Sequence, residues 1–279
     1  MQGRIIKIIS NDYTVLSNDK EYVCKSRGLF RNQNIKPLVG DIVKFDSENN
    51  YILEVEKRSN SLVRPPVSNI DQALIVTPVK PSFDSNLLDK LLCIIEYNNV
   101  KPIICFTKLD LLNNEELNNI MEYINYYKKI GYMVFDNSEI EEIKKIFKDK
   151  ITVFTGQTGA GKSTLINKLD SKFNLETGEI SEKLGRGRHT TRHTELHHLY
   201  DGLVADTPGF SKVDFIDMTK YDIRDNFIEF NNYKENCKYR DCMHENELVC
   251  EVKNKVNDGT IIKSRYNNYL NFISERRNS

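Results

Sequence analysis

The sequence has no net charge, no long apolar run and no beginning that resembles a leader peptide. Its 40 Lys and Arg residues balance its 40 Asp and Glu residues, so any surface that attracts nucleic acid must be local. No apolar stretch approaches the roughly 20 residues that cross a bilayer. The first ten residues, MQGRIIKIIS, contain neither a long apolar core nor a small-residue cleavage site. We therefore expect a cytoplasmic protein without a membrane partner.

Cysteine is also scarce, since six residues in a chain of 279 are too few for a disulfide scaffold. Cys24, Cys93 and Cys105 each lie in an apolar run and are expected to be small core residues. The other three fall between positions 237 and 250, and this clustering needs a separate explanation. The length is enough for two or three domains, each with its own core.

The first 62 residues predict a small antiparallel barrel. Short strand-like runs alternate there with turn clusters such as Ser17-Asn18-Asp19, so that about five strands fit into sixty residues. This pattern is typical of an OB-fold or of an SH3-like barrel. The run Arg64-Pro65-Pro66 then marks a boundary.

From residue 70 onward, apolar strands alternate with amphipathic helices. Strands are expected at 73–79, 103–107, 133–135 and 151–155, with apolar residues at helical spacing between them. Such alternation predicts a largely parallel α/β sheet. After residue 211 the pattern becomes helical and irregular. The expected domains are a barrel over 1–62, an α/β domain over 63–211 and a mainly helical domain over 212–279.

Residues 156–163 match the phosphate-loop pattern G-x-x-x-x-G-K-S, with an expected strand before it and an expected helix after it. Its glycines let backbone N–H groups point at phosphate oxygens, and the helix N-terminus adds its positive dipole end. Lys162 should reach the β- and γ-phosphates, and the Ser163 hydroxyl should bind Mg²⁺. A chance glycine-rich turn is the alternative. The predicted phosphate-binding residues are Gly156, Gln157, Thr158, Gly159, Ala160, Gly161, Lys162, Ser163 and Thr164.

Thr107-Lys108-Leu109-Asp110 resembles the N-K-x-D motif that reads guanine, with threonine in place of the usual asparagine. Asp110 would accept hydrogen bonds from N1–H and the N2 amino group of guanine, an arrangement that adenine lacks. Lys108 would lie over the base plane. A surface turn after a strand is the alternative. Ser138, after the next strand, is a further candidate for the base loop.

Asp206-Thr207-Pro208-Gly209 follows an apolar strand and fits the D-x-x-G motif. Asp206 would hold Mg²⁺ through water, and the Gly209 N–H would face the γ-phosphate. Ordinary GTPases have the base-reading motif last, whereas here it precedes the phosphate loop. The sequence therefore predicts a circularly permuted G domain, in which the residues from 211 onward are tethered directly to the γ-phosphate sensor.

The segment 183–198 is rich in Gly, Arg and His and is typical of switch I, with Thr190 or Thr191 closing over Mg²⁺. Ras-like enzymes place a water-orienting Gln after D-x-x-G. This chain has Phe210, so its intrinsic turnover should be slow. His189 is the candidate catalytic residue. Arg188 and a group supplied by a partner are the alternatives.

Cys237, Cys242, His244 and Cys250 place three sulfurs and one imidazole within fourteen residues. Cys₃His sets bind structural zinc, and four protein ligands leave no open catalytic position. One structural Zn²⁺ per chain is therefore expected. Glu245 or Glu247 could replace one ligand. The alternative is three unrelated cysteines and a surface histidine.

With these modules in view, the whole chain resembles the ribosome small-subunit-dependent GTPase A (RsgA) family of bacterial assembly factors. The motif order, the run Gly187-Arg188-His189-Thr190-Thr191 and the Cys/His set carry the resemblance. It implies an OB-fold barrel and a zinc domain that contact ribosomal RNA. It also implies GTP hydrolysis to GDP that the small subunit stimulates, in support of late maturation and factor release. Arg192 departs from the family, in which a further threonine is common there. We expect a monomer.

Three other functions fit part of these observations. The first is a different permuted GTPase acting on the large subunit or on RNA, against which the barrel and the cysteine cluster argue. The second is an RNA-binding switch that is gated by nucleotide and has negligible turnover, which Phe210 makes conceivable. The third is an ATPase, which Asp110 disfavours.

Overall fold

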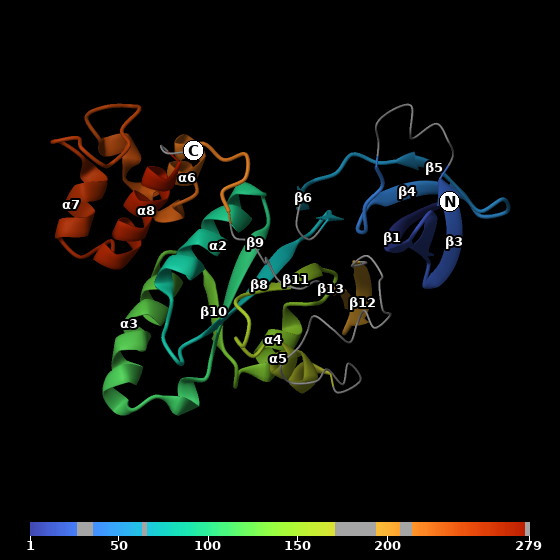
Figure 1. The fold of residues 1–279 in the computed structure, drawn as a ribbon, viewed down its shortest axis with the longest axis horizontal. Coiled ribbons are helices and arrows are strands. Elements are labelled where there is room, and N and C mark those ends of the chain that lie inside the picture. The colour runs from blue at the N-terminus through green and yellow to red at the C-terminus, as the bar shows by residue number, and fades with distance from the viewer. Residues whose placement is uncertain (27–35, 63–65, 171–193, 207–213, 277–279) are drawn as a thin grey trace. The chain divides into compact units, whose positions relative to one another are not determined.

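The computed structural model describes residues 1–26, 36–62, 66–170, 194–206 and 214–276 (Figure 1). The chain divides into two compact units, and each is described by itself. The first unit contains residues 1–76 and 137–211, and the second contains residues 77–136 and 212–279. Among the described helices, none has the length and apolar character that crossing a membrane requires.

The first unit begins with a closed five-stranded barrel. Neighbouring strands pair in the order β1-β2-β3-β5-β4, and β4 pairs back with β1 to close the ring. The β3–β5 pair is parallel and the other pairs are antiparallel. This order confirms the OB-fold and excludes the SH3-like alternative. The strands are β1 (Gln2–Ile9), β2 (Asp12–Ser17), β3 (Lys20–Ser26), β4 (Ile42–Asp46) and β5 (Tyr51–Val55).

Alternation of side chains builds the barrel core. In β2, Tyr13 and Val15 are buried, whereas the neighbouring Thr14 is only partly covered. Val15 is packed in one cluster with Phe45 and Ile52 from β4 and β5, which are fully buried. A strand with a period of two directs alternate residues inward, so the apolar pattern of the sequence also sets the register.

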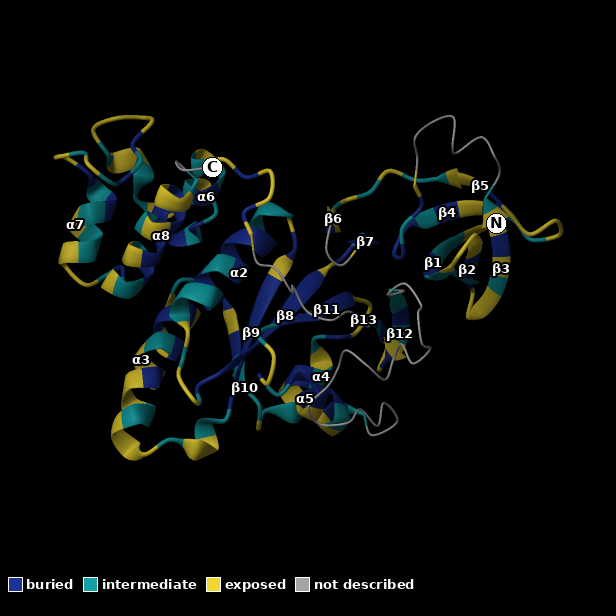
Figure 2. Cartoon of the chain, in the orientation of Figure 1, coloured by how far each residue is buried: buried dark blue, intermediate teal, exposed yellow. Residues whose placement is uncertain are grey.

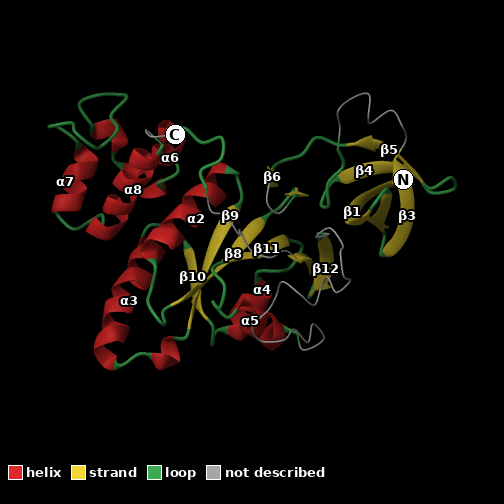
Figure 3. Ribbon diagram, viewed as in Figure 1, coloured by secondary structure: helices red, strands yellow, loops and turns green. Residues whose placement is uncertain are grey.

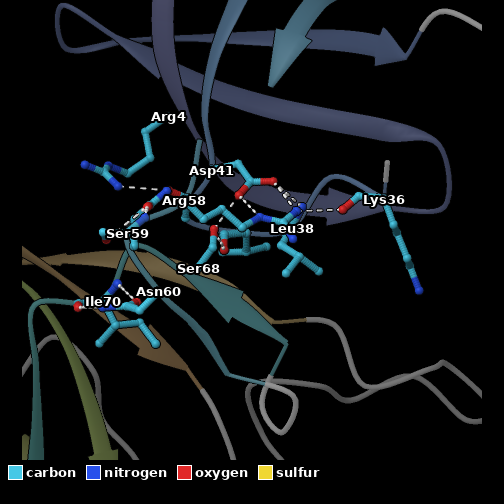
Figure 4. A network of polar contacts seen from close by, with 12 residues as sticks. Arg4, Lys36, Leu38, Asp41, Arg58, Ser59, Asn60, Ser68 and Ile70 are labelled. Carbon is cyan, nitrogen blue, oxygen red and sulfur yellow. Dashed lines mark hydrogen bonds and ion pairs between the residues drawn. The ribbon is translucent and has the colours of Figure 1, made fainter. Parts of the chain in front are cut away.

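A polar network fixes the segment that leaves the barrel (Figure 4). Asp41 is fully buried, and Arg58 donates to both of its carboxylate oxygens at 2.7 and 2.8 Å. Ser68 donates to the same carboxylate at 2.5 Å. Gly40 has φ +95°, and a Cβ there would lie 2.0 Å from the Ser68 carbonyl oxygen, so only glycine fits. The short strands β6 (Ser61–Leu62) and β7 (Val67–Ser68) pair beside this network.

The rest of the first unit supplies a buried α/β layer. β8 (Gln72–Pro78) is buried along its whole length and pairs in parallel with β11 (Ile151–Thr155), as Figure 2 shows in dark blue. β11 pairs in parallel with β13 (Gly202–Asp206), which is antiparallel to β12 (Glu195–Leu199). The helices here are α4 (Ile140–Lys145) and α5 (Lys162–Leu169). β12 also pairs with β1 at Lys7 and Glu195, which form an ion pair of 2.7 Å.

The second unit combines a parallel strand pair with two sets of helices (Figure 3). Local signals start these helices: Asp84 caps the first one, and Asn113 and Glu116 form a capping box at the next. The strands are β9 (Lys101–Thr107) and β10 (Met133–Asp136). The helices are α2 (Ser85–Tyr97), η1 (Leu109–Leu111), α3 (Asn114–Lys129), α6 (Lys220–Asp225), η3 (Ile228–Asn232), η4 (Lys234–Asn236), α7 (Glu251–Asn257) and α8 (Lys263–Glu275).

These elements confirm the predicted fold class: an OB-fold barrel, an α/β domain and a mainly helical C-terminal part. Each of the four α/β strands expected from the sequence is present within one or two residues of its expected bounds. The boundary signal Arg64-Pro65-Pro66 lies mostly outside the described residues, and the domain limits at 62 and 211 stay predictions.

A buried charge network joins the helices of the second unit. Arg265 on α8 is 1% exposed, and its Nη1 donates to Asp89 on α2 at 2.6 Å. Its Nε and Nη2 donate to the two carboxylate oxygens of Glu229 at 2.6 and 3.0 Å. Tyr127 and Asn268 donate to the remaining acceptor positions of Asp89, both at 2.7 Å. Burial by itself would lower the pKa of Arg265, but the two carboxylates outweigh it and hold that pKa well above its ordinary value.

Replacing Arg265 with Met should therefore destabilise the second unit strongly. The change leaves two buried carboxylates without a cation, and breaking a buried ion pair from one side costs about 3–5 kcal/mol. Chemical denaturation followed by circular dichroism would measure the loss in the free energy of unfolding.

The control is Lys234→Met, which removes a half-exposed cation 3.6 Å from Asp225 and should have little effect. Neutralising the carboxylates together with Arg265 (Asp89→Asn, Glu229→Gln and Arg265→Met in one chain) should recover part of the loss. Equal stability of Arg265→Met and the native chain would contradict this account of the network.

Candidate nucleotide-binding and metal-binding sites

The phosphate loop follows β11 directly and has the backbone that its glycines were expected to allow. Gly156, Gly159 and Gly161 have φ of +130°, +74° and +92°. A Cβ on Gly156 would lie 2.1 Å from the Val76 carbonyl oxygen, so a larger residue would displace β8. Gly161 is the N-cap of α5 and brings no side-chain cap to the helix. The N-cap residue therefore does not occupy the N–H groups of the first turn of α5, which an anion could bind.

Lys162 lies folded inside this loop. Its Nζ donates to the carbonyl oxygens of Gly156 and Gln157 at 2.7 and 2.8 Å. Burial lowers its pKa to about 8, because the ammonium loses contact with water. A phosphate group would supply the missing negative charge. Ser163 is buried beside Lys162, whereas Thr164 is exposed.

The predicted base-reading motif lies at the carboxyl end of β9 in the second unit. Thr107 is the last residue of that strand, is buried, and accepts a hydrogen bond from the Val79 N–H at 3.1 Å. Lys108 has a left-handed backbone with φ +65°, and its Nζ donates to the Lys80 carbonyl oxygen at 3.3 Å. Leu109 is partly covered, and Asp110 is exposed on η1, where its carboxylate can meet a ligand.

The other predicted nucleotide residues are less fully described. Ser138 follows β10 in sequence, is exposed, and its carbonyl oxygen accepts from the Ile140 N–H at 2.8 Å. Asp206 ends β13, where its backbone is paired with Glu195. The predicted switch and sensor residues His189, Thr190, Thr191 and Gly209 lie outside the described residues.

The four predicted metal ligands converge on one point in the second unit. The Cys237 Sγ lies 3.6 Å from the His244 Nδ1 and 3.9 Å from the Cys250 Sγ. The His244 Nδ1 lies 3.3 Å from the Cys250 Sγ, and all four ligand atoms, with that of Cys242, are within 4.8 Å of one another. A tetrahedral ion bound by sulfur at about 2.3 Å needs ligand atoms about 3.8 Å apart. The Cys₃His cluster thus has the dimensions of a metal site.

The chemistry of the donors also suits a cation. Burial lowers the pKa of His244 to about 4, so its imidazole stays neutral and can coordinate through Nδ1. Burial raises the pKa of the Cys242 and Cys250 thiols, which a bound cation would reverse by favouring the thiolates. The backbone N–H of Lys253 lies 3.5 Å from the Cys250 Sγ, so this ligand also caps α7.

Supporting contacts hold the ligand loop in place. Glu247 accepts hydrogen bonds from the backbone N–H groups of Met243 and Glu245 at 2.6 and 2.8 Å. Its carboxylate therefore organises the loop and does not belong to the cluster of ligands. Tyr266 on α8 donates to the His244 carbonyl oxygen at 2.6 Å, and Tyr269 donates to that of Met243.

No sequence pattern predicts these supporting roles. Tyr266 and Tyr269 are aromatic residues in a basic terminal segment. Their helical spacing indicates that they share a face of α8, and a shared face by itself does not indicate which loop it contacts.

Comparisons with known proteins match one family over nearly the whole chain. The model of the RsgA GTPase family matches residues 55–216, and that of the RsgA N-terminal domain matches residues 2–52. A relative from Oceanobacillus iheyensis, named small ribosomal subunit biogenesis GTPase RsgA 2, is 50% identical over 98% of this chain and 97% of its own. The Bacillus subtilis protein named small ribosomal subunit biogenesis GTPase RsgA is 44% identical over 98% of this chain and 97% of its own.

Two solved structures are similar as well. YloQ, described as a circularly permuted GTPase, has a TM-score of 0.86 and 38% identity, over 99% of this chain and 95% of its own. YjeQ from Thermotoga maritima has a TM-score of 0.87 and 31% identity, over 100% of this chain and 99% of its own. Both likenesses extend over the barrel, the α/β domain and the cysteine-containing part together.

The Cys₃His cluster should carry one metal ion per chain in protein purified without chelators. Cys242→Ala should lower the metal content to near zero and destabilise the second unit, because ion binding contributes directly to folding there. Elemental analysis by mass spectrometry would measure the metal.

The matched control is Cys93→Ala, which removes another buried thiol of the same unit outside the cluster. This variant should keep its metal. Native protein with almost no bound metal, or equal losses in the two variants, would refute the site.

Proposed function

The chain belongs to the RsgA family and is a GTPase, and on that premise we propose that it acts on the small ribosomal subunit. In this proposal it binds GTP, hydrolyses it to GDP when it engages the subunit, and thereby assists late maturation and the release of assembly factors. The observation that supports this best is the full-length match to relatives named small ribosomal subunit biogenesis GTPases. The match includes both modules outside the G domain.

We assign the triphosphate to the loop from Gly156 to Thr164. Lys162 is the key residue, because its buried ammonium already lies inside the loop, where it donates to two carbonyl oxygens of the described residues. A phosphate offers charged oxygens to the same ammonium, and such charge-assisted hydrogen bonds are the stronger kind. Ser163 would bind Mg²⁺, with Asp206 acting through water and Thr190 or Thr191 completing the shell.

Guanine would be read by Thr107, Lys108, Leu109 and Asp110, with Ser138 as a further member of the base loop. The exposed carboxylate of Asp110 can accept hydrogen bonds from N1–H and the N2 amino group of guanine, whereas adenine has an acceptor at N1 and no amino group at C2. This preference argues against the ATPase alternative. The Gly209 N–H would contact the γ-phosphate, and His189 would supply the catalytic group that Phe210 cannot provide.

We propose that the ion in the Cys₃His cluster is Zn²⁺. Three soft sulfurs with one imidazole disfavour the hard ions Mg²⁺ and Ca²⁺, and four protein ligands are typical of structural zinc sites. Bound zinc would hold the loop of residues 237–250 in shape and would complete the folding of the 212–279 domain. This domain and the barrel over 1–62, which follow and precede the G domain over 63–211 in the sequence, would contact ribosomal RNA. The protein would act as a cytoplasmic monomer.

The proposal predicts slow GTP turnover that purified small subunits accelerate and that large subunits do not. ATP turnover should stay at background with either subunit. Phosphate release, measured with each nucleotide and each subunit, would separate the ribosomal function from an ATPase and from a switch with negligible turnover. Acceleration by large subunits alone would contradict the proposed partner.

Lys162→Ala is the control for the nucleotide site in this assay. It removes two charge-assisted hydrogen bonds of about 1.5–3 kcal/mol each, so GTP affinity should fall at least about 100-fold. Unchanged affinity in a fluorescent-nucleotide titration would reject the assignment of the phosphate loop.

A second prediction concerns His189. In His189→Ala, nucleotide affinity should be retained, and turnover stimulated by the subunit should fall about 100-fold or more, as expected when an acid–base group is lost. His198→Ala is the matched control, because His198 is an exposed histidine of β12 outside the proposed site. If Arg188→Ala abolishes stimulation and His189→Ala does not, the catalytic role moves to Arg188.

A further inference from the structure

Residues 79–83, which we call the β8–α2 loop, pass beside the predicted base-reading motif within the second unit. At the start of this loop, Val79 donates its N–H to the Thr107 carbonyl oxygen at 3.1 Å. At its other end, the ring centroid of Phe83 lies 4.9 Å from that of Tyr123 on α3. Aromatic rings at this distance attract each other. The loop is therefore attached both to the end of β9 and to α3.

Lys108 of the predicted base-reading motif is bound to the β8–α2 loop through its side chain. Its Nζ donates to the Lys80 carbonyl oxygen at 3.3 Å. Its backbone is left-handed, with φ +65°, a conformation that costs free energy in residues other than glycine and persists where the surroundings fix it. The Lys80 carbonyl oxygen thus fixes the far end of a side chain whose near end begins in a constrained backbone.

Lys80 is itself held by an ion pair with α3. Its Nζ donates to the Glu116 Oε1 at 2.6 Å, and the two side chains are 30% and 40% exposed. The Glu116 Oε2 accepts from the Asn113 N–H at 3.1 Å, in the capping box that begins α3. The hydrogen bond from the Lys80 ammonium lowers the pKa of the Glu116 carboxyl, so this group is ionised at neutral pH.

We propose that Lys80 and Glu116 are positioning residues for guanine recognition. Their ion pair keeps the Lys80 carbonyl oxygen in place, and that oxygen holds the Lys108 side chain in the orientation that lies over the base. Neither Lys80 nor Glu116 needs to touch the nucleotide. This inference rests on the proposed function, in which Lys108 contacts guanine.

The partial exposure of this ion pair sets the size of the effect. Pairs that water can reach stabilise a conformation only weakly, so the loss of one should change an affinity by at most about five-fold. Lys108 would contact the base and not the phosphates. The loss of affinity should therefore be the same for GDP as for GTP.

Two variants separate positioning from helix capping. Glu116→Gln keeps an oxygen that can accept from the Asn113 N–H, since Gln also serves at this position of a capping box, but it removes the charge that binds Lys80. Lys80→Met removes the ammonium and leaves the carbonyl oxygen. Glu116→Gln is also made in a chain that carries Lys108→Met.

The matched control is Glu142→Gln. It breaks the ion pair of Glu142 with Lys145 on α4, which has the same length of 2.6 Å and is exposed as well. The measurement is titration with fluorescently labelled GDP, followed by displacement of the label with unlabelled GDP and GTP. The control should bind both nucleotides like the native chain.

We expect Glu116→Gln and Lys80→Met each to raise the Kd of GDP and that of GTP by the same factor, about two- to five-fold. Lys108→Met should itself weaken the binding of both nucleotides. Adding Glu116→Gln to Lys108→Met should change the Kd no further. The two effects are not additive because the ion pair acts through Lys108.

Native affinity in both Glu116→Gln and Lys80→Met would overturn the proposal and would leave the proposed function intact. An equal loss from Glu116→Gln with and without the Lys108 side chain would overturn it as well, since the effect would then pass through the helix and not through Lys108. Native affinity in Lys108→Met would instead refute the base-reading role in the proposed function, and this inference with it.

Discussion

The buried guanidinium of Arg265 is the constraint on which the second unit depends. It binds Asp89 of α2 and Glu229 of η3 at 2.6 Å each, with no solvent to screen the charges. Two buried carboxylates without this cation would be costly, so α2, η3 and α8 can pack together only when all three groups meet. The same α8 contacts the loop of residues 237–250 and, through Phe272, the ring of Phe215. The Arg265 network therefore fixes α8 against α2, and with α8 the loop of residues 237–250 that it contacts.

The first unit has a similar buried interaction where the chain leaves its barrel. Asp41 is buried and bound by Arg58 and Ser68, which come from the segment that leads from the barrel to β8. In both units, a buried carboxylate bound by an arginine holds separate elements together. Exposed pairs such as Lys44–Glu54 contribute little by comparison, because water screens them and their side chains lose entropy.

Under the proposed function, circular permutation places the C-terminal part of the chain directly after the predicted D-x-x-G motif. After the predicted D-x-x-G motif, the chain enters a segment that α2 and α8 hold at Phe215, Asp217 and Met218. Burial lowers the pKa of Lys162 to about 8, and a phosphate bound in the predicted loop would supply a negative charge beside its ammonium.

The sequence alone determined the order of the motifs and the strands of the α/β layer, and it predicted the phosphate loop and the set of metal ligands. Each of these depends on neighbouring residues, on glycine conformation or on a short period, and local chemistry decides such features. Tertiary structure alone decided the OB-fold over an SH3-like barrel, the role of Glu247 as a loop support and the partners of Arg265. Asp89 lies 176 positions from Arg265 in the chain. A pairing over that separation follows from how helices pack together, and no local pattern in the sequence predicts it.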